Sequence, residues 1–440
     1  MSIHMISVAT KLFSDVKDSR PSILLLGNYR PALAAARSLR DAGYRIVMGK
    51  RGGEGFSEYS RFVDEAWDHP PVETDVVGLE VALTKFLSER EDIQFVLPIS
   101  EPFVMFFAER MQTLPGGATL VTPRADLVKT CADKVTMLYT AVEEDVPVLP
   151  CAVLVANSDN AALGREVGLP IVARPLTPGA KFNEKKAVII DSWSDYQQFI
   201  SDWCKPDFPI LIQRQAVGPR VNVFFTAREG ELINNLQTYI RRTDSLDGTG
   251  YAVDGVTVAT SAPLLEDCEK LAKALDYTGI GLAQFIVDPK TGERCFLELN
   301  PRIAGSQAIT EQMGFEMCRI AVDLALGLDP EPPKKVRGIR SGFRYAWVYG
   351  DIRGLRFALA RGEIGFGGAM RWALKTFWTA LWADHHMTWA LHDPAPTLML
   401  FARQLFPSLE RLSGTSVKER QSHGMDVPDM AGEDPPARGV

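Results

Sequence analysis

Short apolar runs and helically spaced apolar positions alternate along the first 125 residues. Continuous apolar runs of this length are typical of buried strands, whereas apolar positions three and four apart predict helices. The expected strand, helix, strand and later strand fall at residues 22–28, 31–43, 44–48 and 95–99. This succession predicts a parallel α/β domain over residues 21–125. The loop Ser100-Glu101 then lies at the carboxyl end of a strand, where such sheets bind ligands.

Helical periodicity and strand patterns are interleaved with turn signals in residues 126–330. Helices are expected at residues 126–142, 263–277 and 306–326. Strands are expected at residues 169–174, 187–190, 221–227 and 231–236. The dipeptide Glu229-Gly230 between the last two strands is a hairpin signal, so this part of the chain is expected to be α+β.

A second hairpin is expected near residue 290. Residues 281–287 and 295–300 are apolar strand patterns that flank the turn-forming stretch 288–292, DPKTG. Both strands carry polar side chains inside otherwise core-like runs. Polar residues in such positions need an explanation other than solvation.

The polar residues of this hairpin form a pattern with a chemical meaning. Glu298 and Asn300 share one strand face because side chains two apart point the same way, and the hairpin brings Gln284 close to both. An oxygen-rich trio with Arg302 at its end suits Mg²⁺ and phosphate. The alternative is a solvated strand face that ends in an ordinary Asn-Pro turn.

Composition excludes several classes of protein. The chain of 440 residues is 46% hydrophobic and 23% charged, which is typical of a soluble globular protein. Its net charge of −7 argues against broad nucleic-acid binding. No run of 18 apolar residues and no signal-peptide pattern occur, and the six cysteines are scattered without a CxxC pair. A cytoplasmic protein without a disulfide frame or zinc site is expected.

The first domain lacks a glycine-rich phosphate loop. Only Gly27 precedes its first helix, so the GxGxxG pattern of dinucleotide-binding domains is absent. A nicotinamide dehydrogenase built on this domain is therefore disfavoured.

The sequence ELNPR, followed by small residues and preceded by the strand GLAQFIVD, resembles the metal-binding end of ATP-grasp enzymes. The likeness is greatest to the synthetase units of the carbamoyl-phosphate synthase large subunit and related ATP-dependent carboxylate–amine ligases. It implies a parallel-sheet domain at 21–125 and an ATP-grasp fold of two α+β subdomains at 126–330, with a lid at about 147–215. A small, mainly helical region would follow at 331–412. The two ends of the chain, 1–20 and 413–440, are expected to be disordered.

The resemblance also implies a nucleotide site. Lys134, Arg174 and Lys181 would contact the phosphates of ATP, although a helix lysine such as Lys134 is more often simply solvated. The remaining nucleotide-binding residues would be Gln213, Gln215, Val217 and Asn222. Two features depart from the family: the lid loop has only Gly179, and no acid follows Gly218 to bind the ribose, so Asn222 is expected to substitute.

The function that the resemblance implies is Mg²⁺-dependent, with Mn²⁺ as an alternative metal. Gln284, Glu298 and Asn300 would bind the metal, and Arg302 and Arg174 would be catalytic. The enzyme would join a small-molecule carboxylate to an amine or ammonia through an acyl-phosphate. The alternative is a catalytically degenerate ATP-binding module with a regulatory or assembly role, which the two departures favour.

Two basic segments have open interpretations. Arg241 and Arg242 could hold a substrate carboxylate or lie on a solvated loop edge, with equal weight.

Residues 331–412 have a net charge of +6 and an apolar helix face made by Met370, Leu374, Phe377 and Leu381. Tryptophans at 372, 378, 382 and 389 lie near this face. A small domain packed on the core is favoured over peripheral membrane contact through 353–389, and an oligomer is compatible with either.

Overall fold

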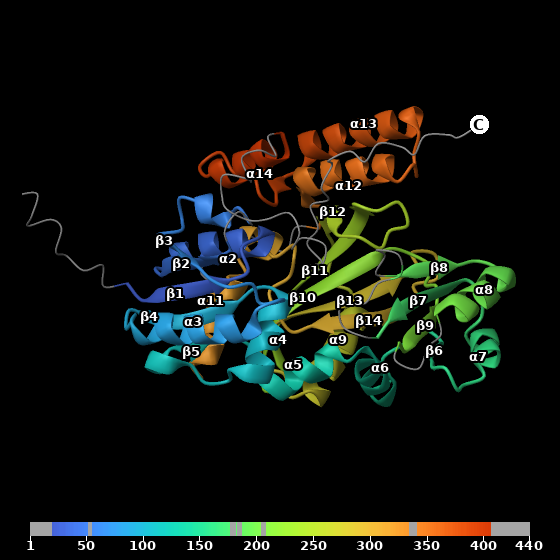
Figure 1. Cartoon of the computed structure of the whole chain (residues 1–440), viewed down its shortest axis with the longest axis horizontal. Helices are drawn as coiled ribbons and strands as arrows, with labels where there is room; N and C mark the ends of the chain where they lie inside the picture. Colours follow the sequence, from blue (N-terminus) through green and yellow to red (C-terminus); the bar gives the residue numbers. More distant parts are fainter. Residues whose placement is uncertain are drawn as a thin grey trace, which may run out of the picture.

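The computed structural model describes residues 20–51, 55–176, 182, 187–203, 208–333 and 341–405. Their strands form sheets of five, seven and four strands. Figure 1 shows the five-stranded sheet on the left, the seven-stranded sheet in the centre and the four-stranded sheet on the right, with a layer of C-terminal helices above. The expected disordered ends, 1–20 and 413–440, lie outside the described residues apart from Arg20.

The five-stranded sheet is parallel, as predicted. Its strands are β1 (Ser22–Leu26), β2 (Arg45–Lys50), β3 (Glu65–Asp68), β4 (Ile93–Pro98) and β5 (Thr119–Leu120), in the order β3-β2-β1-β4-β5. The helices are α2 (Arg30–Asp41), α3 (Val76–Ser88) and α4 (Glu101–Arg110), with short 3-10 turns at Ser57–Tyr59 and Pro115–Gly117. Alternate residues of β1 face opposite layers: Ile23 packs in one core cluster, and Leu24 packs in another with α3 and α4. The strand order changes direction between β1 and β4. In open α/β sheets, the region outside the carboxyl ends of such strands is the usual ligand-binding crevice.

The seven-stranded sheet is the centre of the molecule. Its order is β14-β13-β10-β11-β12-β15-β16. The strands are β10 (Arg220–Arg228), β11 (Glu231–Thr243), β12 (Ala252–Thr257), β13 (Gly279–Val287), β14 (Arg294–Asn300), β15 (Arg344–Ala346) and β16 (His385–His386). Both predicted hairpins occur, and the turn between β10 and β11 has positive φ angles at Glu229 and Gly230. Helix α9 (Ala262–Ala274) forms as expected and packs on β10 and β11.

The four-stranded sheet has a hydrophobic core of its own. It contains β6 (Cys151–Leu154), β7 (Ile171–Pro175), β8 (Val188–Ile190) and β9 (Ile210–Arg214) in the order β6-β9-β7-β8, with helices α7 (Asn160–Val167) and α8 (Trp193–Trp203). The strands predicted at 169–174 and 187–190 are therefore confirmed. Leu154, Ile171, Tyr196 and Ile212 belong to this separate core.

Two helices that the periodicity predicts as continuous are broken. The segment 126–142 forms α5 (Ala125–Ala132) and α6 (Lys134–Glu143), because the Asp133 carboxylate accepts hydrogen bonds from the N–H groups of Val135 and Thr136 and caps a new helix. The segment 306–326 forms α10 (Ala308–Gln312) and α11 (Met317–Ala325). Gly314 and Glu316 between them have positive φ angles, which end a right-handed helix.

The C-terminal segment packs on the core in part. Helices α12 (Val348–Ala360), α13 (Phe366–Trp382) and α14 (Ala395–Leu405) follow β15. Tyr349 of α12 and Leu400 of α14 are buried in the core cluster that contains Ile23. The expected packing is wrong for α13, because the face made by Met370, Leu374, Phe377 and Leu381 is exposed. Only the opposite side of this helix, with Trp372 and Thr376, is buried.

Two buried aspartates fasten this segment to the rest of the chain. Asp351 forms an ion pair with Arg242 of β11, so Arg242 has a structural partner rather than either role expected from the sequence. Asp393 accepts hydrogen bonds from Arg37 Nε of α2 at 3.0 Å and from the Ser60 hydroxyl at 2.7 Å. The five described cysteines are free thiols.

Candidate active site

The β13–β14 hairpin sets the positions of the predicted metal ligands. Its turn is closed by a hydrogen bond from the Asp288 N–H to the Glu293 carbonyl at 2.8 Å. From this turn the strands pair in one register as far as Phe285 and Phe296, and a register shift between Gln284 and Phe285 then places Gln284 opposite Glu298 and Leu282 opposite Asn300. The turn therefore fixes the register close to it, and the irregularity at Gln284 brings Glu298 opposite Gln284.

The side chains of this hairpin form a connected polar cluster. The Asn300 amide donates a hydrogen bond to Glu298 Oε1 at 3.0 Å, and Arg302 Nη2 donates to Asn300 Oδ1 at 3.2 Å. Gln284 Nε2 donates to Asn222 Oδ1 on the neighbouring strand β10 at 2.9 Å. We call Asn222, Gln284, Glu298 and Asn300 the amide–carboxylate cluster. The structure thus brings the predicted metal ligands together and adds Asn222 to them.

Three arginines act electrostatically on the one carboxylate of this cluster. Burial opposes ionisation of Glu298, but the Asn300 hydrogen bond and the charges of Arg174, Arg220 and Arg302 outweigh it and hold the pKa of Glu298 below its ordinary value. Burial lowers the pKa of Arg220, and Glu298 partly offsets that effect. Glu298 therefore stays ionised, and positive charge exceeds negative charge around it.

Two of these arginines have guanidinium N–H donors without an acceptor among the described residues. Among the described residues, no hydrogen bond or ion pair engages the Arg174 guanidinium. Arg220 donates to the Gly250 carbonyl at 2.8 Å, but its Nε is buried without a partner. Buried donors without acceptors are costly, so this part of the molecule is suited to an anionic ligand that brings acceptor oxygens.

The donor set fits a magnesium ion better than a softer metal. It offers amide and carboxylate oxygens, and the described residues contain no group of three or more His, Cys, Asp or Glu side chains that could hold a metal. Mg²⁺ is commonly held by one or two carboxylates together with substrate phosphates and water. A single carboxylate, Glu298, near the Arg174 guanidinium, which has no partner among the described residues, is consistent with a metal that arrives with phosphate.

The crevice of the five-stranded sheet meets this cluster. Arg302 Nη2 lies 3.4 Å from Glu101 Oε2 at the start of α4, and Tyr29 donates to the Ile99 carbonyl at 3.3 Å. Burial opposes protonation of Arg302, but Tyr29, Glu101 and Glu298 outweigh it and raise its pKa. The loop at Ser100-Glu101 therefore lies next to the metal hairpin.

Arg30 is an unusual feature of the same crevice. Its guanidinium stacks on the Trp347 ring at 3.9 Å and donates to the Ala252 carbonyl at 3.2 Å, and the residue is only 5% exposed. Burial lowers its pKa to about 10. No described carboxylate pairs with it, and a Cβ added at Gly305 would lie 2.9 Å from its Nη2. A buried guanidinium without a counter-charge is costly unless a ligand supplies one.

The predicted nucleotide-binding residues are placed less closely together. Gln213 is buried on β9, and its Nε2 has no partner in the described part of the chain. The Gln215 N–H already donates to the Pro170 carbonyl at 2.7 Å, and the Val217 side chain is exposed. Lys134 is the first residue of α6, which packs on β14. Lys181 lies outside the described residues.

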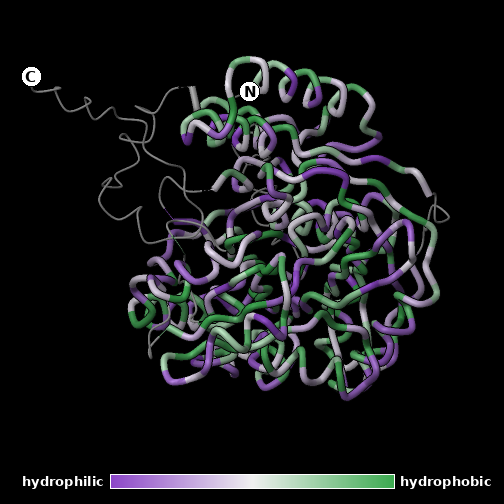
Figure 2. The backbone as a smooth tube through the Cα atoms, turned by 90° about the vertical axis from the view of Figure 1, so that its right-hand side faces the viewer, coloured by the Kyte–Doolittle hydropathy of each residue, from purple (hydrophilic) through white to green (hydrophobic). Residues whose placement is uncertain are grey.

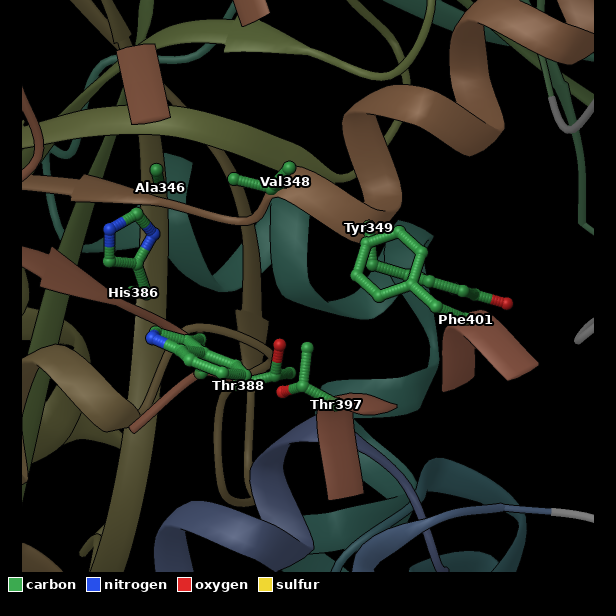
Figure 3. Close-up of a pocket in the computed structure, with 8 residues that line it drawn as sticks. Ala346, Val348, Tyr349, His386, Thr388, Thr397 and Phe401 are labelled. Carbon is green, nitrogen blue, oxygen red and sulfur yellow. The ribbon is translucent and has the colours of Figure 1, made fainter. Parts of the chain in front are cut away.

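A hollow of about 270 Å³ lies elsewhere, between β15, β16 and helices α12 and α14. Figure 3 shows its lining, in which the rings of Tyr349 and Phe401 lie together and His386 comes from β16. No acidic residue, arginine or lysine lines it. The hollow therefore does not offer the phosphate chemistry of the amide–carboxylate cluster.

Comparisons with known proteins agree with this arrangement. A family profile described as "Carbamoyl-phosphate synthase L chain, ATP binding domain" matches residues 254–331, which include the metal hairpin. The carbamoyl phosphate synthase large chain of Thermotoga sp. (strain RQ2) is 24% identical over 327 residues, covering 69% of this chain and 28% of its own length. The arginine-specific large chain of Bacillus subtilis (strain 168) is 21% identical over 302 residues, covering 67% and 28%.

Solved structures give the same result. The biotin carboxylase of Campylobacter jejuni in its β-γ-ATP complex superposes with a TM-score of 0.56, at 15% identity, over 73% of this chain and 74% of that one. The ADP complex of purK, N5-carboxyaminoimidazole ribonucleotide synthetase, gives a TM-score of 0.58 at 15% identity over 78% and 86%. The chain has the ATP-grasp fold. The resemblance to ATP-grasp ligases that the ELNPR hairpin indicated is therefore confirmed.

The ATP-grasp relatives by sequence are much longer proteins. This chain spans 28% of the length of the carbamoyl phosphate synthase large chains to which it is similar. Likeness at these identities establishes the ATP-grasp fold alone.

Sequence reasoning missed two residues of this candidate site. Arg220 is two residues before Asn222 on β10, so strand alternation could have placed it on the face of Gln284. Arg30 gave no local signal, because its ring partner Trp347 lies more than 300 residues further along the chain.

Proposed function

We propose that this protein is a ligase that joins a carboxylate to an amine or to ammonia at the expense of ATP. The observation that carries the proposal is the set of three guanidinium groups around the single carboxylate of the amide–carboxylate cluster. Such a site suits a polyanion with a bound divalent cation. The likeness to ATP-grasp ligases supports ATP as that polyanion.

Gln284, Glu298 and Asn300 would hold Mg²⁺, or Mn²⁺, next to the phosphates. The metal would supply charge neutralisation on the terminal phosphoryl group while that group is transferred. Asn222 is better suited to this end of the site than to the ribose, because its side chain already contacts Gln284.

The arginines would bind and orient the phosphates. Within the described part of the chain, the planar set of Arg174 donors has no partner, and neither has the buried Nε of Arg220. Arg302, held by Asn300, would stabilise charge that builds on the transferred phosphoryl group. Substrate carboxylate would attack this group to form an acyl-phosphate, and the nitrogen nucleophile would then displace phosphate.

The acid would enter from the crevice of the five-stranded sheet. Arg30 supports this direction, since it is a buried cation without a described carboxylate partner beside Gly305, three residues beyond Arg302. Its charge would be neutralised by an anionic group of the acid. Small carboxylates with a second anionic group are therefore the first substrates to test.

A second candidate is an ATP-binding module without turnover. Two features favour it: no acid follows Gly218, and Asn222, the expected substitute for that acid, is engaged by Gln284. This candidate uses the same ATP and metal residues, so binding alone does not separate the two.

The test measures ATP binding by calorimetry and phosphate release with a panel of acids and amines. Glu298→Gln should lower phosphate release at least a hundredfold and weaken Mg²⁺-dependent ATP binding, because it removes the one carboxylate of the cluster. Glu293→Gln, in the exposed turn of the same hairpin, is the matched control and should behave like the wild type. Binding without release for every acid–amine pair would favour the module, and no binding of ATP would refute both.

A further inference from the structure

Helix α13 presents an apolar face to the outside of the molecule. Seven large apolar side chains along this 17-residue helix are between 50% and 82% exposed. They are Phe366, Met370, Leu374, Phe377, Trp378, Leu381 and Trp382. Single exposed apolar residues are ordinary, but a contiguous group of this size marks an interaction surface. We call these seven residues the outer face of α13.

The opposite side of α13 is fixed to the protein. Trp372 Nε1 donates to Asp351 Oδ1 of α12 at 2.6 Å, and the Thr376 hydroxyl donates to Asp351 Oδ2 at 2.8 Å. Figure 1 shows α13 as the outermost element above α12, and Figure 2 shows the helical layer at the edge of the molecule in the perpendicular view. The rotation of α13 about its axis is therefore set, so its outer face cannot turn inward to be buried.

The charges around this face have one predominant sign. Residues 348–382 contain five basic and two acidic residues, a net charge of +3 in a chain of net charge −7. One of the acids, Asp351, is buried and paired with Arg242. Arg371 and Lys375 of α13, Arg356 of α12 and Arg361 directly after α12 are exposed. Helix α13 has no acidic residue.

Three occupants differ in how well they match this surface. A second copy of the chain would bring Arg371 and Lys375 against another helix that has no carboxylate to pair with them. Residues 413–440 contain no Leu, Ile, Phe, Tyr or Trp to fill the face. An anionic lipid surface offers both an apolar phase and negative charge, and aromatic side chains such as Phe377, Trp378 and Trp382 favour the boundary between lipid and water.

We propose that the outer face of α13 binds the surface of a membrane that contains anionic lipid. The apolar side chains would enter the headgroup region, and the flanking cations would contact lipid phosphates and carboxylates. Among the described helices none is long and apolar enough to cross a bilayer, so the contact would be peripheral. The proposal is independent of the reaction that the ATP-grasp site performs.

The test is sedimentation of the full-length protein with two kinds of vesicle, phosphatidylcholine alone and phosphatidylcholine with phosphatidylserine. Binding to the anionic vesicles is expected, and it should fall in high salt, which screens charges. The double variant Arg371→Gln, Lys375→Gln should reduce partitioning roughly 30-fold, from about fivefold for each cation. Phe377→Glu should abolish binding, because it places a charge in the apolar face.

Val81→Glu on helix α3 is the matched control, since Val81 is 65% exposed on a different surface. It should bind vesicles like the wild type. Thermal melting of each variant, measured by circular dichroism, should match the wild type, because all four substituted side chains are exposed. Loss of vesicle binding in Phe377→Glu with an unchanged melting curve supports the proposal.

Three results would overturn it. The first is an absence of binding to the anionic vesicles. The second is binding that ignores lipid charge and salt. The third is a wild-type dimer in sedimentation velocity that Phe377→Glu converts to a monomer, which would assign the face to a second copy of the chain.

Discussion

Asp351 is the residue whose substitution tests most directly how the C-terminal helices are held. It is 1% exposed, and its carboxylate accepts hydrogen bonds from Trp372 Nε1 at 2.6 Å and from the Thr376 hydroxyl at 2.8 Å. Both of its oxygens also contact the Arg242 guanidinium. Asp351→Asn keeps the volume of the side chain but replaces one acceptor with an NH₂ group that faces these donors.

The expected loss of stability follows from this geometry. Breaking one partner of a buried ion pair costs about 3–5 kcal/mol, because the other charge stays buried without compensation. Arg242 is 20% exposed in its side chain, so water can solvate it in part. A loss of about 3 kcal/mol in the free energy of unfolding is therefore expected for Asp351→Asn.

Urea unfolding of a double-mutant cycle measures this coupling. Arg242→Met alone should also cost about 3 kcal/mol, and the double variant should be less destabilised than the sum of the two by about 2 kcal/mol. Glu363→Gln, an exposed position in the same helical hairpin, is the control and should change stability by less than about 0.5 kcal/mol. Strict additivity, or a near-wild-type Asp351→Asn, would show that the buried pair does not hold α12 and α13 in place.

Two further substitutions test other parts of the molecule. Arg302→Lys should lower turnover on the order of a hundredfold while the melting temperature stays close to wild type. The reason is that an ammonium group lacks the planar pair of donors with which Arg302 can contact Asn300 and a phosphoryl group together. Wild-type turnover in this variant would show that Arg302 takes no part in the reaction. Burial, Arg37 and His386 lower the pKa of His385 from 6.5 to about 4. The unfolded chain therefore gains a proton near pH 6.5 and the folded chain only near pH 4, so full stability is present above pH 6.5 and about 3 kcal/mol is lost as the pH falls to 4. Urea midpoints across this range should fall less in His385→Gln, and equal slopes would contradict the assignment.

The sequence predicted the β13–β14 hairpin because the turn at 288–292 and the strand patterns beside it are local features. The pairing of Gln284 with Glu298 also depends on a register shift beside Gln284, which the sequence pattern does not indicate. The parallel sheet was predictable from local features as well. The three predicted strands, β1, β2 and β4, contain continuous apolar runs, with helical spacing between them.

The features that the sequence did not predict depend on side chains that compete for backbone hydrogen bonds, or on contacts between residues far apart in the chain. The helical spacing of apolar residues continues through Asp133, but the Asp133 carboxylate accepts hydrogen bonds from two backbone N–H groups and caps a new helix there. Arg242 and Asp351 are 109 residues apart, so neither gives a local sign of the other. The exposure of α13 was also hidden, because an apolar helix face predicts burial without stating what covers it.

The Asp393 contacts have a mechanical consequence. Arg37 and Ser60 of the first domain both bind this aspartate, which lies at the start of the last helical segment, and the core cluster of Ile23 includes residues of the central sheet. These hydrogen bonds and the shared core hold the first domain and the central sheet together, so the two should move as one rigid body. The four-stranded sheet has its own core and joins the central sheet near Gly218, whose φ of +116° is accessible mainly to glycine. Opening and closing around a ligand should therefore be a rotation of the four-stranded sheet alone, with Gly218 near its pivot.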